Sequence, residues 1–291
     1  FLWWRRKMNM NDGGSAVAIL QRWSNVLAFI LNCSLTFGNN GFGYGKSIEE
    51  ISDEYQTIIT PPGWAFSIWG VIFALEFVFT AWQLFQSSDN LILNEVVGFF
   101  WVSACLFQSA WNLTIAAQLF VVSALVLAGI AISLAIICLR ITPKEMNKHE
   151  TVAEYFLVRF SFGLHGGWTC VATLLSFNLA AVANGVSPKG QLVVAIISLA
   201  VVVAASLYFG IFKGNLSYSL AICWALFGIS SEQGQTSMIL GPEIANHIRI
   251  SSMVCAVSIT LLTCVCEFIR VRKVHKDTDE HRKNLISSRN S

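Results

Sequence analysis

The chain has 291 residues, of which 55% are hydrophobic and only 12% are charged. That share of charged residues is about half of what an ordinary soluble domain carries, and the mean hydropathy is +0.60. A soluble fold could not bury so much apolar surface, whereas a lipid bilayer accepts it. The formal net charge of +2 is too small to indicate a polyanionic partner. The composition therefore excludes a water-soluble globular protein, a disordered chain and a nucleic-acid-binding protein.

Eight apolar stretches follow one another along the chain, most of them with the length of about 20 residues that a membrane-spanning helix needs. They are predicted at Ala18–Phe37, Gly63–Phe85, Glu95–Trp111, Ala117–Leu139, Glu154–Val182, Leu192–Phe212, Leu216–Ile229 and Arg249–Ile269. These stretches are too long for strands, and only helices or closed barrels satisfy the backbone in lipid. We therefore expect an all-α integral membrane protein with about eight transmembrane helices.

The distribution of positive charge predicts the orientation of these helices independently. With eight spans and the N-terminus inside, 15 of the 19 basic residues lie on the inner side. They are Arg5, Arg6, Lys7, Arg22, Arg140, Lys144, Lys148, Lys213, Arg270, Arg272, Lys273, Lys276, Arg282, Lys283 and Arg289. Three lie outside (Lys46, Lys189 and Arg249), and Arg159 lies within the fifth stretch. We expect both termini to be cytoplasmic.

Three ionisable side chains lie well inside the predicted helices, Glu76, Arg159 and His165, and Arg159 is near the inner end, from which its long side chain can reach the interface. Glu76 is near the middle of the second stretch, at a depth where a charge is costly. It is either a group that binds a proton or contacts a ligand, or a neutral, hydrogen-bonded structural residue. His165, in the fifth stretch, has two interpretations as well. It could ligate haem iron or hydrogen-bond a ligand, or it could simply pack in the core.

Tryptophan is unusually frequent, with ten residues in the chain. Many tryptophans anchor helices at the bilayer surface. Trp69, Trp111, Trp168 and Trp224 are expected to lie deeper, where an indole N–H needs a partner. A pocket with indole walls would suit a flat, apolar, conjugated ligand, and helix packing is the alternative explanation.

The segment Thr60–Phe73 (TPPGWAFSIWGVIF) resembles a signature of the TspO/MBR translocator family, also called tryptophan-rich sensory proteins. In that family, prolines precede a helix with the pattern W-x-F-x-x-x-W. The matching positions here are Trp64, Phe66 and, one residue early, Trp69. Other segments are similar to family segments in the same order. They are Ile51–Tyr55, Gln108–Trp111, Gly167–Thr173 and Asn215–Gly228, with departures from the usual residue at Gln108, Leu164 and Ser176.

The resemblance covers about Ala18 to Ile269 and implies a five-helix bundle that binds porphyrins and other hydrophobic ligands. In this family the pocket is formed by the loop before the second helix together with helices 1, 2, 3 and 5. Carried over by motif, the implied ligand-binding residues are Trp64, Phe66, Trp69, Gln108, Trp111, Trp168 and Ala172.

The resemblance also implies a division of the chain. Residues 1–17 would be a polar, basic N-terminal segment and 18–183 the TspO-like bundle. Residues 184–270 would be a three-helix C-terminal extension, and 271–291 a disordered basic cytoplasmic tail. The outer loop Gly38–Thr60, glycine-rich and then acidic, is either a lid or a solvated connector.

The function that we favour is a membrane protein that binds, and transports or senses, a planar hydrophobic ligand such as a tetrapyrrole. Porphyrin or haem would be a ligand and not an obligatory cofactor, and no metal or catalytic residue is expected. The partners would be the lipid bilayer and the small molecule. Gly163 and Gly167 form a G-x-x-x-G step that would serve an internal contact or a homodimer.

Three alternatives stay open. The first is a proton-coupled transporter of a small solute that uses Glu76. The second is an enzyme that degrades porphyrin through tryptophan radicals, and the third is a structural subunit of a membrane complex.

Overall fold

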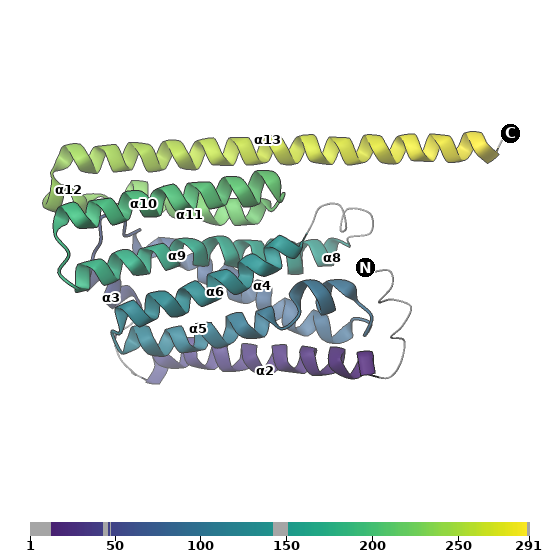
Figure 1. The fold of residues 1–291 in the computed structure, drawn as a ribbon, viewed down its shortest axis with the longest axis horizontal. Helices are drawn as coiled ribbons and strands as arrows, with labels where there is room; N and C mark the ends of the chain where they lie inside the picture. Colours follow the sequence, from purple (N-terminus) through teal and green to yellow (C-terminus); the bar gives the residue numbers. More distant parts are fainter. Residues whose placement is uncertain (1–12, 43–45, 47, 142–150, 290–291) are drawn as a thin grey trace.

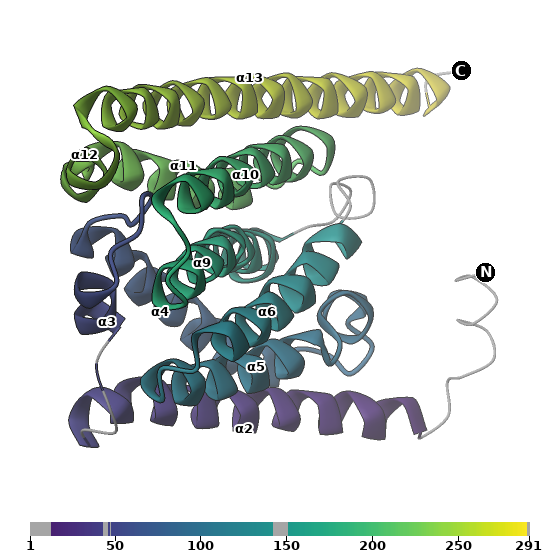
Figure 2. The same cartoon turned by 60° about the vertical axis from the view of Figure 1, so that its left-hand side comes forward.

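The computed structural model describes residues 13–42, 46, 48–141 and 151–289, and these form eight long helical segments (Figures 1 and 2). The long segments are α2 (Gly13–Phe42), η1–α4–η2 (Gly63–Ser67, Ile68–Trp82, Gln83–Phe85), α5 (Phe100–Ala116), α6 (Phe120–Arg140), α8–η4–α9 (Val152–Glu154, Tyr155–Phe160, Ser161–Ala183), α10–η5 (Pro188–Leu207, Tyr208–Phe212), α11 (Leu216–Ser231) and α13 (Pro242–Arg289). Shorter helices are α3 (Ile48–Glu54), η3 (Ile92–Val97) and α12 (Gly234–Leu240).

The prediction of an all-α membrane protein with about eight helices is confirmed. Six described helices are long and apolar enough to cross a bilayer. The other two long segments, α5 and α11, have 17 and 16 residues. They reach about 25 Å at 1.5 Å per residue. α11 packs against α9, α10 and α13, so its polar backbone is largely shielded by neighbouring helices and not by lipid.

The third helix differs from its predicted range of Glu95–Trp111. The short helix η3 ends at Val97, and Gly98 follows with a φ of +51°, a conformation that favours glycine. α5 begins two residues later and continues to Ala116. The local apolar pattern did not reveal this break, because it runs through the glycine without interruption.

The C-terminal segment also differs from its prediction. Residues 271–291 were expected to be disordered, whereas α13 is helical through Arg289. The segment that follows Arg270 contains neither glycine nor proline, and it extends a helix that already exists, so no new helix nucleus has to form. α13 therefore projects well beyond the other helices (Figure 1).

α2 presents polar side chains to the bundle and apolar side chains outwards. Leu20, Trp23 and Leu27 are more than half exposed on its outer side, as expected of a lipid-facing surface. The buried side hydrogen-bonds to neighbouring segments. These bonds are Gln21 to the Leu93 carbonyl (2.6 Å), Asn25 to Gln83 (2.9 Å), Asn32 to Gln108 (3.1 Å) and Asn112 to Thr36 (2.8 Å). Interhelical hydrogen bonds of this kind hold helices together where lipid offers no hydrophobic drive.

Two glycines bring α9 and α11 into close contact. A Cβ added to Gly167 would overlap the backbone carbonyl oxygen of Tyr218, and one added to Gly163 would overlap the side chains of Asn215 and Ser217. The G-x-x-x-G step of α9 is thus used for packing within the chain. It is the contact that joins the predicted bundle to the predicted extension.

The C-terminal helices share a hydrophobic core with α4 and α9. Ile72 of α4, Trp168 of α9, Val202 of α10, Ile222 of α11 and Ile259 of α13 belong to one buried cluster. The expected boundary between residues 183 and 184 coincides with the end of α9. The helices after it pack on the bundle directly.

The two ends of the described chain lie at the same end of the bundle, and α3 and α12 lie at the other (Figure 1). This arrangement agrees with an even number of passes. Five of the basic residues on which the orientation depends, Arg5, Arg6, Lys7, Lys144 and Lys148, lie outside the described residues.

We predict that Gly167→Ala lowers the stability of the protein by about 1–3 kcal/mol, because the added methyl group meets backbone that cannot rotate away. Thermal unfolding in detergent measures the effect. Gly70→Ala is the matched control, since nothing lies within 4 Å of a Cβ at Gly70. Equal melting temperatures for the two variants would contradict the α9–α11 contact.

Candidate functional site

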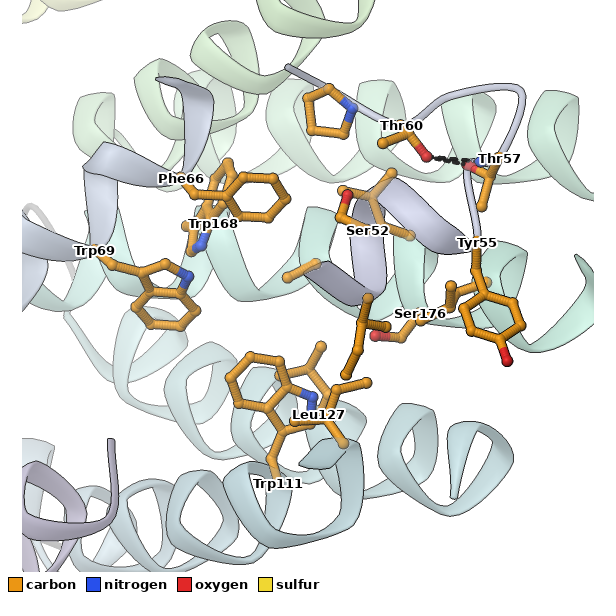
Figure 3. A pocket seen from close by; sticks show the side chains of 16 residues that line it. Ser52, Tyr55, Thr57, Thr60, Phe66, Trp69, Trp111, Leu127, Trp168 and Ser176 are labelled. Carbon is orange, nitrogen blue, oxygen red and sulfur yellow. Dashed lines mark hydrogen bonds between the residues drawn. The ribbon is translucent and has the colours of Figure 1, made fainter. Parts of the chain in front are cut away.

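A cavity of about 80 Å³ lies between the α3 segment and helices α4, α5, α6 and α9 (Figure 3). Its lining is mostly apolar and aromatic. Phe66 and Trp69 come from η1 and α4, Trp111 from α5, Leu127 from α6 and Trp168 from α9. The cavity is therefore assembled from five segments that are far apart in the sequence.

Trp69 is the centre of the aromatic wall. Its ring lies 6.2 Å from that of Trp111 in a stacked arrangement, and 6.2 Å from that of Trp168 at an interplanar angle of 90°. Phe66 meets Trp168 edge to face at 5.9 Å. Edge-to-face and offset-stacked pairs are the arrangements that aromatic rings prefer, so the wall is well packed (Figure 3).

α9 contributes one face to the cavity. Trp168, Ala172, Leu175, Ser176 and Leu179 all line it. Trp168, Ala172, Leu175 and Leu179 follow each other at intervals of three or four, and Ser176 lies four residues after Ala172, which places their side chains on a single helix face. Ala172 leaves room for the cavity beside the large Trp168.

A buried acid–imidazole pair lies next to this wall. Oε1 of Glu76 is 2.6 Å from Nδ1 of His165 and accepts a hydrogen bond of 3.3 Å from Nε1 of Trp101. The Glu76 and His165 side chains are 0% and 2% exposed. Burying a net charge is far more costly than burying a neutral pair. The hydrogen bond between the two side chains therefore takes the place of the water that burial removes.

Trp69 connects the buried pair to the cavity. Its ring lies 5.6 Å from the His165 ring, edge to face, while Trp69 itself lines the cavity. Oε2 of Glu76 and Nε2 of His165 have no hydrogen-bond partner within the described part of the chain. A change in the position of Trp69 would thus alter the surroundings of both atoms.

α3 and the segment after it cover one side of the cavity. Ile51 is 2% exposed and belongs to the bundle core, and the Tyr55 ring contacts that of Phe120 at 4.9 Å. Thr57 and Thr60 hydrogen-bond to each other at 3.0 Å (Figure 3). The described part of the outer loop thus has the position of a lid, the first of the two interpretations offered for it.

We call residues 48–60 the lid segment, and this segment also has contacts farther from the cavity. Thr236 of α12 donates a 2.9 Å hydrogen bond to the carbonyl of Ile58. On the exposed side Lys46 donates to Glu54, and this hydrogen bond raises the pKa of Lys46. The C-terminal extension therefore stabilises the lid segment through this hydrogen bond from α12.

The Pro-Pro-Gly-Trp turn is held by α11. Nε1 of Trp224 donates a 2.8 Å hydrogen bond to the carbonyl of Ala65, and the Trp224 ring meets that of Trp64 edge to face at 4.9 Å. A Cβ at Gly228 would lie 3.2 Å from the Cβ of Ala65, so a small residue is needed there. This contact fixes η1, and with it the direction of Phe66.

The residues expected to bind ligand divide into two groups. Five of them, Phe66, Trp69, Trp111, Trp168 and Ala172, line the cavity. Trp64, Gln108, His165 and Glu76 are not in its lining. Trp64 packs on Trp224, Gln108 accepts a hydrogen bond from Asn32, and His165 and Glu76 bond to each other.

Several lining residues lie outside the positions predicted to bind ligand, among them the polar residues Ser52, Tyr55, Thr57 and Thr60 of the lid segment. Ser52 and Tyr55 belong to the segment Ile51–Tyr55, which resembles a family segment, but their place in the lining depends on how the loop folds back. Leu175 and Leu179 could have been found by continuing the helical interval from Trp168 and Ala172.

A second, wider hollow lies on the outside of the bundle. It has a volume of about 670 Å³ and is lined mainly by apolar residues of α4, α11 and α13, together with Leu164. Among the described residues no group of three or more histidine, cysteine or acidic side chains could hold a metal ion. The buried aromatic cavity is therefore the better candidate for a specific site.

Comparison with known proteins agrees with this architecture. A family model described as "TSPO-like protein" matches residues 22–265. No curated protein and no solved structure is matched by the chain.

We predict that Glu76→Ala lowers the free energy of unfolding by about 3–5 kcal/mol, because it leaves His165 buried without its partner. Glu76→Gln keeps an acceptor for His165 and Trp101 and should cost clearly less. Thermal unfolding in detergent compares the two. Similar losses for Ala and Gln would show that the hydrogen bond to His165 contributes little to stability.

Proposed function

This chain belongs to the TSPO-like family, and we propose that it binds a planar hydrophobic ligand of the tetrapyrrole type within the membrane. The observation that carries the proposal is the cavity walled by Phe66, Trp69, Trp111 and Trp168. Aromatic faces offer stacking to a flat conjugated ligand, and buried apolar clefts with few polar groups are typical of small-molecule sites.

Two indole N–H groups give the cavity its polar contacts. Nε1 of Trp111 and Nε1 of Trp168 are buried and have no hydrogen-bond partner among the described residues. A buried donor without a partner costs free energy. A ligand that offers acceptors to these two groups would recover that cost.

Binding of a tetrapyrrole requires the lid segment to move. Sites for drug-sized molecules have volumes of about 300–1,000 Å³, whereas this cavity has about 80 Å³. The lid segment is the part of the lining that does not belong to a membrane-spanning helix. We propose that displacement of α3 enlarges the cavity, and that the ligand enters from that end.

The positive charges support an orientation for this process. With both termini in the cytoplasm, α3 and α12 lie on the outer side of the membrane. Ligand would then be taken up, or sensed, from the outer side. Labelling of single cysteines placed in α12 and near the end of α13 with a membrane-impermeant reagent tests this orientation.

We predict saturable, micromolar binding of protoporphyrin IX, followed by quenching of tryptophan fluorescence in the purified protein. Trp69→Phe and Trp168→Phe should weaken it by about 3-fold, because phenylalanine keeps a smaller stacking face, whereas loss of the whole aromatic face costs on the order of 1–3 kcal/mol. Trp23→Phe is the matched control, because Trp23 lies on the outer side of α2 and is 55% exposed.

Haem in place of protoporphyrin IX tests the interpretation of His165 as an axial ligand. Selective loss of haem affinity in His165→Ala would support it, and equal loss for both ligands would indicate a structural role through Glu76 and Trp69. Absence of saturable binding to either compound would overturn the tetrapyrrole proposal.

Proton-coupled transport is the second candidate, and the buried pair of Glu76 and His165 favours it. Hydrogen-bonded Glu and His side chains in a membrane interior are the kind of groups that form proton relays. We predict that Glu76→Gln abolishes pH-gradient-driven porphyrin uptake into proteoliposomes while leaving porphyrin binding within about 3-fold of wild type, because Glu76 does not line the cavity. Equal uptake by both proteins would exclude this coupling.

A further inference from the structure

A polar chamber of about 380 Å³ adjoins the aromatic cavity at the end that carries α3 and α12. The two hollows have five lining residues in common, Ser52, Thr57, Thr60, Pro61 and Phe66. A ligand that fills the cavity and extends past these residues would therefore place its outer part in the chamber.

The chamber carries negative charge. Asp53 of α3 and Glu232, which follows α11, are in its lining together with the amide side chains of Gln56 and Gln235. No lysine, arginine or histidine is found among the described residues that line either hollow. Lys46, which is close in sequence, donates to Glu54 and is not in the lining.

The inner part of the site offers hydrogen-bond donors, in contrast to the carboxylates of the chamber. There the polar groups are the unpartnered indole N–H donors of Trp111 and Trp168, which are 6% and 0% exposed. Because both residues line the cavity, a ligand with acceptor atoms would offer these donors a partner. The site therefore offers hydrogen-bond donors at its inner end and carboxylates at its mouth.

We propose that this site selects planar hydrophobic ligands whose outward-facing end is cationic or uncharged, and that it discriminates against ligands with carboxylates at that end. The inference rests on the proposed function and names the class of ligand within it. A carboxylate-bearing ligand is normally matched by arginine or lysine, and the described lining supplies neither.

The physical basis is charge repulsion at the mouth of a cleft. A cleft lined by one sign of charge concentrates the field and favours ligands of the opposite sign. Asp53 and Glu232 are both exposed to water, so screening limits the effect. We expect a preference of about 10-fold, the order of magnitude for unit charges a few ångströms apart in surroundings that resemble bulk water.

The experiment keeps the planar ring constant and varies only its polar arms. Three ligands are titrated against the full chain in a neutral detergent at low salt: protoporphyrin IX, its dimethyl ester and a derivative with two alkylammonium arms. The expected order of affinity is ammonium, then ester, then acid. The double variant Asp53→Asn/Glu232→Gln should reduce the difference between acid and ammonium to about 3-fold or less. Glu243→Gln is the control, because Glu243 is exposed at the start of α13 and lines neither hollow.

The possible results separate this inference from the proposed function. If all three porphyrins bind with equal affinity, or if the acid binds most tightly, the inference is overturned while ligand binding stands. A preference that survives unchanged in the double variant would also overturn it, because the selectivity would then have another source. If none of the three binds saturably, the proposed function itself fails.

Discussion

The hydrogen bond between His165 and Glu76 joins the two helices on which the cavity depends. Phe66 and Trp69 precede Glu76 at the start of the second long segment, and Trp168 follows His165 by three residues. Fixing His165 against Glu76 therefore fixes the positions from which these aromatic rings project. The pair is fully enclosed, so neither group can turn to water instead. Because an unpaired polar group is costly in such surroundings, the contact between α4 and α9 has one strongly preferred register.

The surrounding bilayer explains why so much of the interior is polar. Lipid chains give no hydrophobic reason for helices to associate, so hydrogen bonds and close packing of small residues do this instead. α2 is held by Gln21, Asn25 and Asn32, while its leucines face outwards. α9 and α11 approach through glycine. In a soluble bundle, by contrast, the outward side of each helix is polar.

The C-terminal helices act on the site as well as enlarging the bundle. Trp224 of α11 holds the carbonyl of Ala65, and Thr236 of α12 holds the carbonyl of Ile58. These two backbone groups lie on either side of the prolines that lead into α4. The entrance to the cavity is thus shaped by segments that follow it by more than 150 residues. A movement of the lid segment of the kind proposed for ligand entry would therefore also act on α11 and α12.

The sequence by itself determined the class of fold and much of the aromatic wall. Apolar stretches of bilayer length allow only helices, and the Pro-Pro-Gly-Trp and Gly-Trp motifs identified Phe66, Trp69, Trp168 and Ala172.

Local sequence patterns could not determine the hydrogen-bond and packing partners of side chains. Glu76 and His165 were recognised one at a time, and neither the hydrogen bond from Asn32 to Gln108 nor the packing of Trp64 on Trp224 was predicted. Each of these depends on side chains 25 or more residues apart being brought together by helix packing, and helical periodicity carries no information about such pairings. Only the tertiary structure decided which polar groups share a buried space, and therefore which side chains are free to meet a ligand.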